Sequence, residues 1–216
     1  MKNIENTVPA SDQMINSSEV SYLGDNKAPV RVLVFGNSIT RHSPKAEIGW
    51  YGDYGMAASC AENDYVHRLY AKLTESGREV YMRVRQTAAW ELEFMAGDYF
   101  SRFDGEKDFG ADVIIFRLGE NVRSAECPYF CEAAKDLIDY VNSKCGKVLI
   151  TTCFWRNEVL DEEIKRLADA NGYAIADIGC LDDSLMALGL FEHSGVAAHP
   201  GDEGMEFIAN KIFESL

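Results

Sequence analysis

Residues 30–40, VRVLVFGNSIT, place a serine where a predicted strand ends. The apolar run Val32–Phe35 is typical of a strand that is buried on both faces. Gly36 allows the backbone to turn sharply at the carboxyl end of this strand, the edge where open parallel sheets bind ligands. Ser38 is therefore a candidate nucleophile at the mouth of a cleft. The alternative is that Ser38 only caps the following helix, because serine is a preferred N-cap residue.

Two distant segments supply the other groups that a serine nucleophile needs. Residues 112–121, DVIIFRLGEN, read as a second apolar strand that ends in Gly119-Glu120-Asn121. Residues 195–204, GVAAHPGDEG, place His199 just before a C-terminal helix. A serine hydroxyl is a poor nucleophile at neutral pH, so it requires a nearby base and donors for the developing oxyanion. His199 is the candidate base. Asn121 could simply cap the loop after the second strand, unless it contributes to a site.

The order of these motifs resembles the SGNH or GDSL-like family of esterases and acylhydrolases, over about residues 30–216. That family has a GDS box near its N-terminus, a GxN after a central strand and an HP near its C-terminus. The resemblance implies Ser38 as nucleophile and His199 as base. It also implies an oxyanion hole formed by the backbone N–H of Ser38, a second backbone N–H and the side-chain amide of Asn121. The second N–H donor follows strand two in the family, usually on a glycine, and Ala88 is the best candidate here.

The sequence departs from the family at two positions. Asn37 replaces the usual Asp of the GDS box, a change that can preserve the hydrogen bonds of the turn. The triad acid is normally an Asp three residues before the histidine, but that position is Val196. Glu192 is the nearest upstream carboxylate, and we expect it to orient His199. The alternatives are Asp202 and a backbone carbonyl.

An aromatic insert follows the nucleophile. Between residues 49 and 59, Trp50, Tyr51 and Tyr54 are separated by glycines. These rings are candidate substrate-binding residues, because aromatic side chains can stack on sugar rings or pack on acyl chains. Trp90 and Trp155 are candidates to join them. The alternative is that the rings only bury loop surface.

The apolar pattern predicts an α/β fold. We expect a flavodoxin-like, three-layer α/β/α domain with a five-stranded parallel sheet in the order 2-1-3-4-5, which agrees with the resemblance. The predicted strands cover residues 30–36, 80–84, 112–118, 147–154 and 173–178, and the predicted helices cover residues 62–76, 90–103, 128–143 and 157–171.

The length of 216 residues suits one catalytic domain, which we expect at residues 29–216. The polar residues 1–28 lack the apolar core of a signal peptide, so we expect an N-terminal arm that is at most partly ordered. No segment has the length of a membrane span, and a net charge of -14 disfavours nucleic acid as a partner. Six cysteines without a disulfide pattern favour free thiols in the cytoplasm.

The sequence therefore predicts a serine esterase that acts on short acyl or acetyl esters, including those of carbohydrates, through an acyl-enzyme. Its partner would be a small-molecule or carbohydrate ester, and serine chemistry needs no metal or cofactor. One alternative is a catalytically weak carbohydrate-binding module on the same fold. The other is a metal-dependent hydrolase that uses His193, His199 and Asp202.

Overall fold

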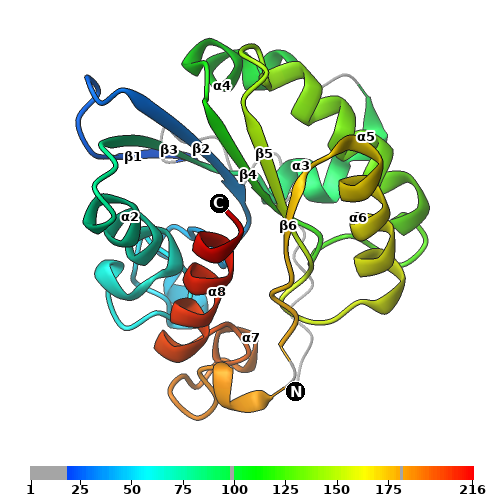
Figure 1. The fold of residues 1–216 in the computed structure, drawn as a ribbon. Coiled ribbons are helices and arrows are strands. Elements are labelled where there is room, and N and C mark those ends of the chain that lie inside the picture. Colours follow the sequence, from blue (N-terminus) through cyan, green and yellow to red (C-terminus); the bar gives the residue numbers. More distant parts are fainter. Residues whose placement is uncertain (1–18, 98–99, 181) are drawn as a thin grey trace.

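A computed structural model describes residues 19–97, 100–180 and 182–216. Within them the strands form one six-stranded sheet in the order β1-β3-β2-β4-β5-β6 (Figure 1). Strands β2 to β6 are parallel, and β1 pairs with β3 in the antiparallel direction. The five predicted strands thus occur in the predicted order, with β1 added at one edge. The strands are β1 (Val20–Leu23), β2 (Val30–Gly36), β3 (Val80–Gln86), β4 (Val113–Arg117), β5 (Lys147–Thr151) and β6 (Ala174–Ala176).

Helices cover both faces of this sheet, as the predicted three-layer α/β/α fold requires (Figure 1). Helices α2 (Tyr65–Glu75) and α8 (Asp202–Ser215) pack on one face. The other face is covered by α3 (Ala88–Glu93), α4 (Asp104–Phe109), α5 (Cys127–Val141) and α6 (Glu158–Asn171). The short helix α7 (Ser194–Ala197) precedes α8.

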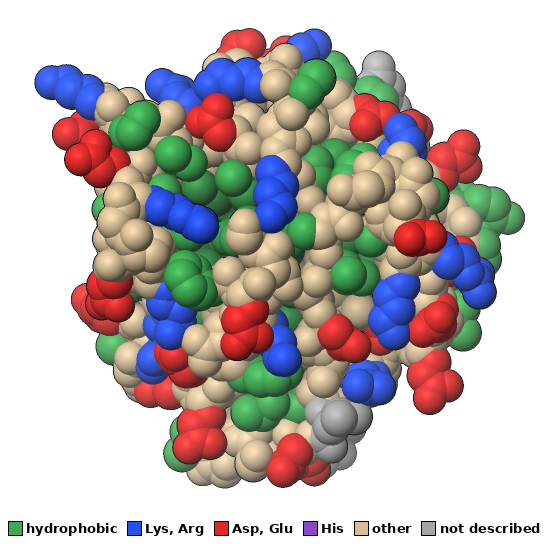
Figure 2. Space-filling model, viewed as in Figure 1, with side chains coloured by type: hydrophobic (Ala, Val, Ile, Leu, Met, Phe, Trp, Pro, Cys, Tyr) green, Lys and Arg blue, Asp and Glu red, His purple; other side chains and the backbone are tan. Residues whose placement is uncertain are grey.

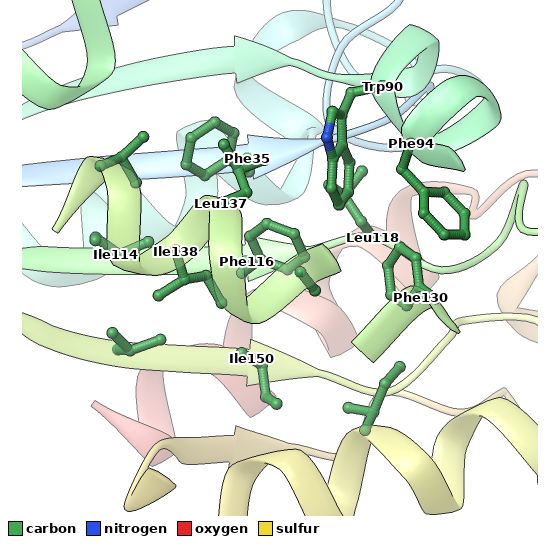
Figure 3. Packing of buried hydrophobic residues seen from close by; sticks show 14 of the residues in the cluster. Phe35, Trp90, Phe94, Ile114, Phe116, Leu118, Phe130, Leu137, Ile138 and Ile150 are labelled. Carbon is green, nitrogen blue, oxygen red and sulfur yellow. The ribbon is translucent and has the colours of Figure 1, made fainter. Parts of the chain in front are cut away.

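Strand β2 shows why both faces are buried. Its side chains alternate between the two sides of the sheet, as in any strand. Val32 and Val34 contact the cluster beneath α2 and α8, whereas Leu33 and Phe35 contact the cluster beneath α3 and α5. Figure 3 shows the second cluster, in which Phe35 lies among aromatic side chains from neighbouring elements. The buried central strand fixes the position of the turn that follows it.

Several elements differ from the predicted boundaries. The helix predicted over residues 90–103 is divided into α3 and the 3-10 helices η4 (Phe94–Ala96) and η5 (Phe100–Phe103). Gly97, with a φ of 140°, ends the first part. Helix α4 follows without having been predicted. The described residues also form the 3-10 helices η2 (Ala46–Ile48), η3 (Ala61–Asn63) and η6 (Asp183–Leu185).

The edge strand β1 lies inside the predicted N-terminal arm. Glu19 forms an ion pair with Arg85 at 2.7 Å, and the Tyr22 ring stacks on Tyr81 with centroids 5.4 Å apart. The rest of the predicted arm up to residue 18 lies outside the described residues. Ordered structure therefore begins before residue 29, ahead of the predicted domain boundary.

The charged surface, the helices and the cysteines each bear on the sequence predictions. Acidic and basic side chains are interspersed over the face of the molecule seen in Figure 2. Among the described residues, none of the helices has both the length and the apolar character that crossing a membrane requires. All six cysteines are free thiols.

Candidate active site

The turn that carries Ser38 begins where β2 ends. A Cβ atom at Gly36 would lie 1.7 Å from Thr40 Oγ1, so the close approach of Thr40 requires glycine at this position. The N–H groups of Thr40 and Arg41 donate to the carbonyl of Asn37 at 2.9 and 3.0 Å. The Thr40 hydroxyl is in turn hydrogen-bonded to Tyr65 at 2.7 Å. Ser38 is half-buried on a turn that its neighbours hold on both sides.

The structure brings Ser38 and His199 together across 161 positions of the sequence. Ser38 Oγ lies 2.8 Å from His199 Nε2, a normal hydrogen-bonding distance. His199 reaches this position because it lies between α7 and α8, beside the carboxyl end of the sheet. This is the spacing that a serine nucleophile and its general base require.

Helix α7 supplies the partner of the second ring nitrogen. His199 Nδ1 lies 2.6 Å from the carbonyl oxygen of Gly195, four residues earlier in the chain. A carbonyl oxygen can only accept, so Nδ1 carries the proton. The neutral imidazole then presents the lone pair of Nε2 to the hydroxyl of Ser38. This is the tautomer that can accept the serine proton.

Neither of the two carboxylates predicted as possible triad acids is the hydrogen-bond partner of His199 Nδ1. Glu192 is exposed, and within the described part of the chain it forms neither a hydrogen bond nor an ion pair. Asp202 accepts from the N–H and the hydroxyl of Ser59 at 2.8 and 2.6 Å, and from Asn63 at 3.0 Å. The geometry thus contradicts the expectation that Glu192 orients His199. The one-turn helix α7 brings a main-chain carbonyl to Nδ1 instead, which is the third alternative left open by the sequence.

Burial lowers the pKa of His199 from 6.5 to about 4. The hydrogen bond to Gly195 and the carboxylate of Glu120 act in the opposite direction, and His42 and Arg117 add to the lowering. Loss of water penalises the charged imidazolium, whereas a neutral carbonyl compensates less than a carboxylate would. His199 is therefore neutral over most of the pH range.

Trp155 holds the imidazole from the side. Its ring meets that of His199 edge to face, with centroids 5.0 Å apart and an interplanar angle of 87°. The indole N–H donates to the carbonyl of Ala198 at 2.9 Å, so the ring is fixed to the same loop. Of the aromatic residues that the sequence suggested, Trp155 is the one in contact with His199.

The predicted oxyanion donors are only partly free. The N–H of Ser38 makes no hydrogen bond to the described part of the chain. The N–H of Ala88 donates to the side chain of Gln86 at 3.1 Å, which occupies this predicted donor. Asn121 Nδ2 donates one hydrogen to Glu91 at 2.7 Å and has a second hydrogen to offer.

A buried polar network lies next to the Ser38 turn. Asn37 Nδ2 donates to Glu120 at 2.7 Å and to Glu91 at 3.1 Å, while its Oδ1 accepts from Arg117 at 3.1 Å. Arg117 also forms an ion pair with Glu120 at 2.6 Å. An aspartate at position 37 would place a third carboxylate against two others, and it would have no N–H to donate. The network explains why an asparagine fits here.

The charged members of this network are not among the site residues that the sequence predicted. A signal was available for Arg117, since it is the single charged residue in the apolar run Val113–Leu118. Glu91 is likewise flanked by Trp90 and Leu92. Buried charges of this kind need partners, which marks them as members of a network.

The aromatic insert is mostly a packing element. Trp50 is only 2% exposed; it donates to the carbonyl of His42 at 3.0 Å and packs on Tyr54 and Phe191. Trp90 is buried in the core shown in Figure 3. Burial contradicts a substrate contact for Trp50 and Trp90, because the surrounding protein already covers nearly all of each ring. Tyr51 is 75% exposed, and Tyr54 is half-buried.

The residues considered for a metal site have other partners. His199 uses its ring nitrogens on Ser38 and Gly195, and Asp202 holds Ser59. His193 caps α7 by accepting from the N–H of Val196 at 3.3 Å. Over the described residues, no group of three or more His, Cys, Asp or Glu side chains is arranged to hold a metal ion.

Comparison with known proteins identifies the fold. No protein-family model and no curated protein sequence matches the chain. A family 3 carbohydrate esterase from Clostridium thermocellum superposes with a TM-score of 0.58 over 86% of this chain and 94% of that chain, at 13% identity. TesA gives a TM-score of 0.56 over 86% of this chain and 97% of that chain, at 14% identity.

A two-domain esterase active on acetylated mannans gives a TM-score of 0.54 over 86% of this chain and 48% of that chain, at 18% identity. Other similar solved structures are of candidate SGNH hydrolases and GDSL-like lipases. At this level of identity the likeness concerns the fold. The chain has the fold of the SGNH and GDSL-like hydrolases, as its motifs predicted.

Proposed function

We propose that this protein is a serine esterase that hydrolyses short acyl esters through an acyl-enzyme. The distance of 2.8 Å between Ser38 Oγ and His199 Nε2 carries this proposal. The hydrogen bond from Nδ1 to Gly195 supports it further, because it leaves Nε2 unprotonated and able to accept a proton. Solved esterases with the same fold agree with ester hydrolysis as the reaction.

The proposed reaction has two halves. Ser38 Oγ attacks the ester carbonyl carbon while its proton passes to His199 Nε2. The backbone N–H of Ser38 and the amide of Asn121 stabilise the oxyanion of the tetrahedral intermediate. His199 then gives the proton to the leaving alcohol, and the acyl group remains on Ser38. Water, deprotonated by His199, attacks the acyl-enzyme. When this second intermediate collapses, the acid leaves and His199 returns the proton to Ser38 Oγ.

Acetylated carbohydrates are the proposed substrate class. Two of the similar structures are esterases whose names refer to carbohydrate or to acetylated mannans. The exposed ring of Tyr51 in the insert is available to a sugar. Activity should fall from acetyl to dodecanoyl p-nitrophenyl esters, and a steady rise along this series would contradict short-acyl specificity.

A fluorophosphonate probe tests the proposed mechanism. The wild-type protein should be labelled at Ser38, and Ser38→Ala should abolish labelling and nearly all ester hydrolysis without unfolding the protein. Wild-type protein that binds acetylated oligosaccharides but is not labelled would instead be a binding module. Activity that resists Ser38→Ala but is lost to a chelator would indicate a metal-dependent hydrolase.

A further inference from the structure

Glu91 is a fully buried carboxyl group with no part in the reaction described above. It lies on α3 and is 0% exposed. Its oxygens accept from the N–H of Gly119, from the backbone N–H of Asn121 at 3.1 Å and from Asn121 Nδ2 at 2.7 Å. Asn37 Nδ2 donates to it as well, at 3.1 Å. One side chain thus connects the residue before the nucleophile with the proposed oxyanion donor.

The two bonds to Asn121 restrict this residue in different ways. The bond to its backbone N–H fixes the chain after β4, and the bond to Nδ2 fixes the rotation of the amide. An oxyanion donor is effective only when it is held in place before the reaction. Because Glu91 takes one of the two Nδ2 hydrogens, the other keeps a defined direction.

A carboxylate suits this position because every partner of Glu91 is a donor. Burial and the carboxylate of Glu120 raise the pKa of Glu91, against the lowering effect of the donors on Asn121 and Gly119. A buried carboxyl group costs stability unless its hydrogen bonds are satisfied. Here the hydrogen bonds of the Glu91 carboxyl group are to residues in the two turns that carry Ser38 and Asn121.

We propose that Glu91 is a positioning residue, which holds the Asn121 amide so that its second N–H faces the oxyanion formed at Ser38. The proposal rests on the proposed function, because the oxyanion arises only in acyl transfer. Glu91 does not touch the substrate; it acts through Asn121.

Glu91→Gln tests this role, because it keeps the size of the side chain but turns one acceptor into a donor that faces other donors. We expect kcat to fall about 10- to 100-fold with little change in KM, less than the roughly 10²- to 10³-fold expected for loss of a whole donor. Glu106→Gln is the matched control. Glu106 is also buried, but it pairs with Arg83 at 2.6 Å on the α4 side of the sheet. Its variant should keep kcat within about twofold.

A double-mutant cycle separates positioning from general damage. In an Asn121→Ala background, Glu91→Gln should cause little further loss of kcat, because the group it positions is absent. Multiplicative losses, or an unchanged kcat in the single variant, would overturn the proposal. If Glu91→Gln does not fold by circular dichroism, Glu91→Asp takes its place, and its kcat should fall because the shorter side chain cannot reach both Asn121 donors.

A readout independent of activity distinguishes this proposal from the proposed function. The side-chain amide of Asn121, observed by NMR on 15N-labelled protein, should exchange its hydrogens faster in Glu91→Gln than in the wild type. Unchanged exchange would overturn the role of Glu91 alone. A wild-type protein that is neither labelled at Ser38 nor active on esters would overturn the proposed function, while the exchange measurement would still show whether Glu91 holds the amide.

Discussion

The Nδ1–H of His199 donates to a main-chain carbonyl, which carries less negative charge than a carboxylate. Both groups fix the same tautomer, so the proposed general base keeps its direction. They differ in how far they would stabilise the imidazolium in the proposed reaction, in which Ser38 gives its proton to His199. With only the Gly195 carbonyl as partner, burial dominates and the pKa of His199 falls to about 4.

This pKa predicts an unusual pH profile. The proposed base works only when it is neutral, so kcat/KM should rise as the pH increases through about 4 and stay level above pH 5. An ordinary histidine would lose activity below its pKa of about 6.5. The measurement is kcat/KM for a short acyl ester between pH 3 and 8. An acidic limb centred near pH 6.5 would mean that His199 is charged more easily than its surroundings indicate.

The position of Glu192 gives a second prediction. Glu192→Gln should leave kcat within about twofold of the wild type, because this exposed side chain has no contact with the ring of His199. The assay is hydrolysis of the same ester, with His199→Ala as the control that removes the proposed base. A large loss of kcat at unchanged KM would indicate that the 189–193 segment moves to bring the carboxylate to Nδ1.

The end of strand β2 and the turn that follows it determine where Ser38 lies. Strand β2 is fixed by pairing with both β3 and β4. Gly36 then brings the backbone against Thr40, which is tied to Tyr65 on α2. The proposed nucleophile is therefore positioned by the sheet on one side and by a helix on the other.

Gly36→Ala should displace this turn. The new methyl group would lie 1.7 Å from Thr40 Oγ1 and 2.5 Å from its Cβ, so Thr40 and the turn must move. We expect labelling of Ser38 by the fluorophosphonate to slow at least about 10-fold, since a small misplacement of a reacting group costs up to about 10²-fold in rate.

Gly105→Ala is the control for this substitution. Gly105 lies in α4, where an added Cβ would meet only the movable end of Arg83, at 2.9 Å. Alanine is also the better helix former. The control should therefore keep the wild-type labelling rate. Equal labelling of the Gly36→Ala variant would show that the turn tolerates the methyl group.

Across the whole chain, the sequence predicts features that follow from local patterns. It does not predict features that depend on contacts between distant residues. Alternating apolar strands and amphipathic helices are local patterns, so the order of the five parallel strands could be predicted. The pairing of Ser38 with His199 followed from the motifs and from the edge where parallel strands end. The burial of Trp50 could not be predicted, because it depends on the insert packing against Ala187 and Val196.

The same limit applies to the buried charges and to the edge strand. Glu91 lies on α3, whereas Arg117 ends β4 and Glu120 follows it in the next turn. Only the folded chain shows that all three share Asn37 as a partner. Strand β1 has four residues, VSYL, in a polar segment, and local pattern gives it little weight. It forms because β3 offers an open edge for pairing.

Strand β1 leads to a prediction about the domain boundary. A chain of residues 29–216 should be less stable than one of residues 19–216, because it loses the pairing of β1 with β3, the stack of Tyr22 on Tyr81 and the ion pair of Glu19 with Arg85. An aromatic pair alone contributes about 0.5–1.5 kcal/mol, and a loss of 1 kcal/mol lowers Tm by about 2–4 °C in a domain of this size. Thermal unfolding of the two chains measures the difference in Tm. Unpaired edge strands promote self-association, and size-exclusion chromatography detects whether the exposed edge of β3 causes it. Equal Tm values would place the stable domain boundary at residue 29, as the sequence alone suggested, and would make β1 an appendage to the sheet.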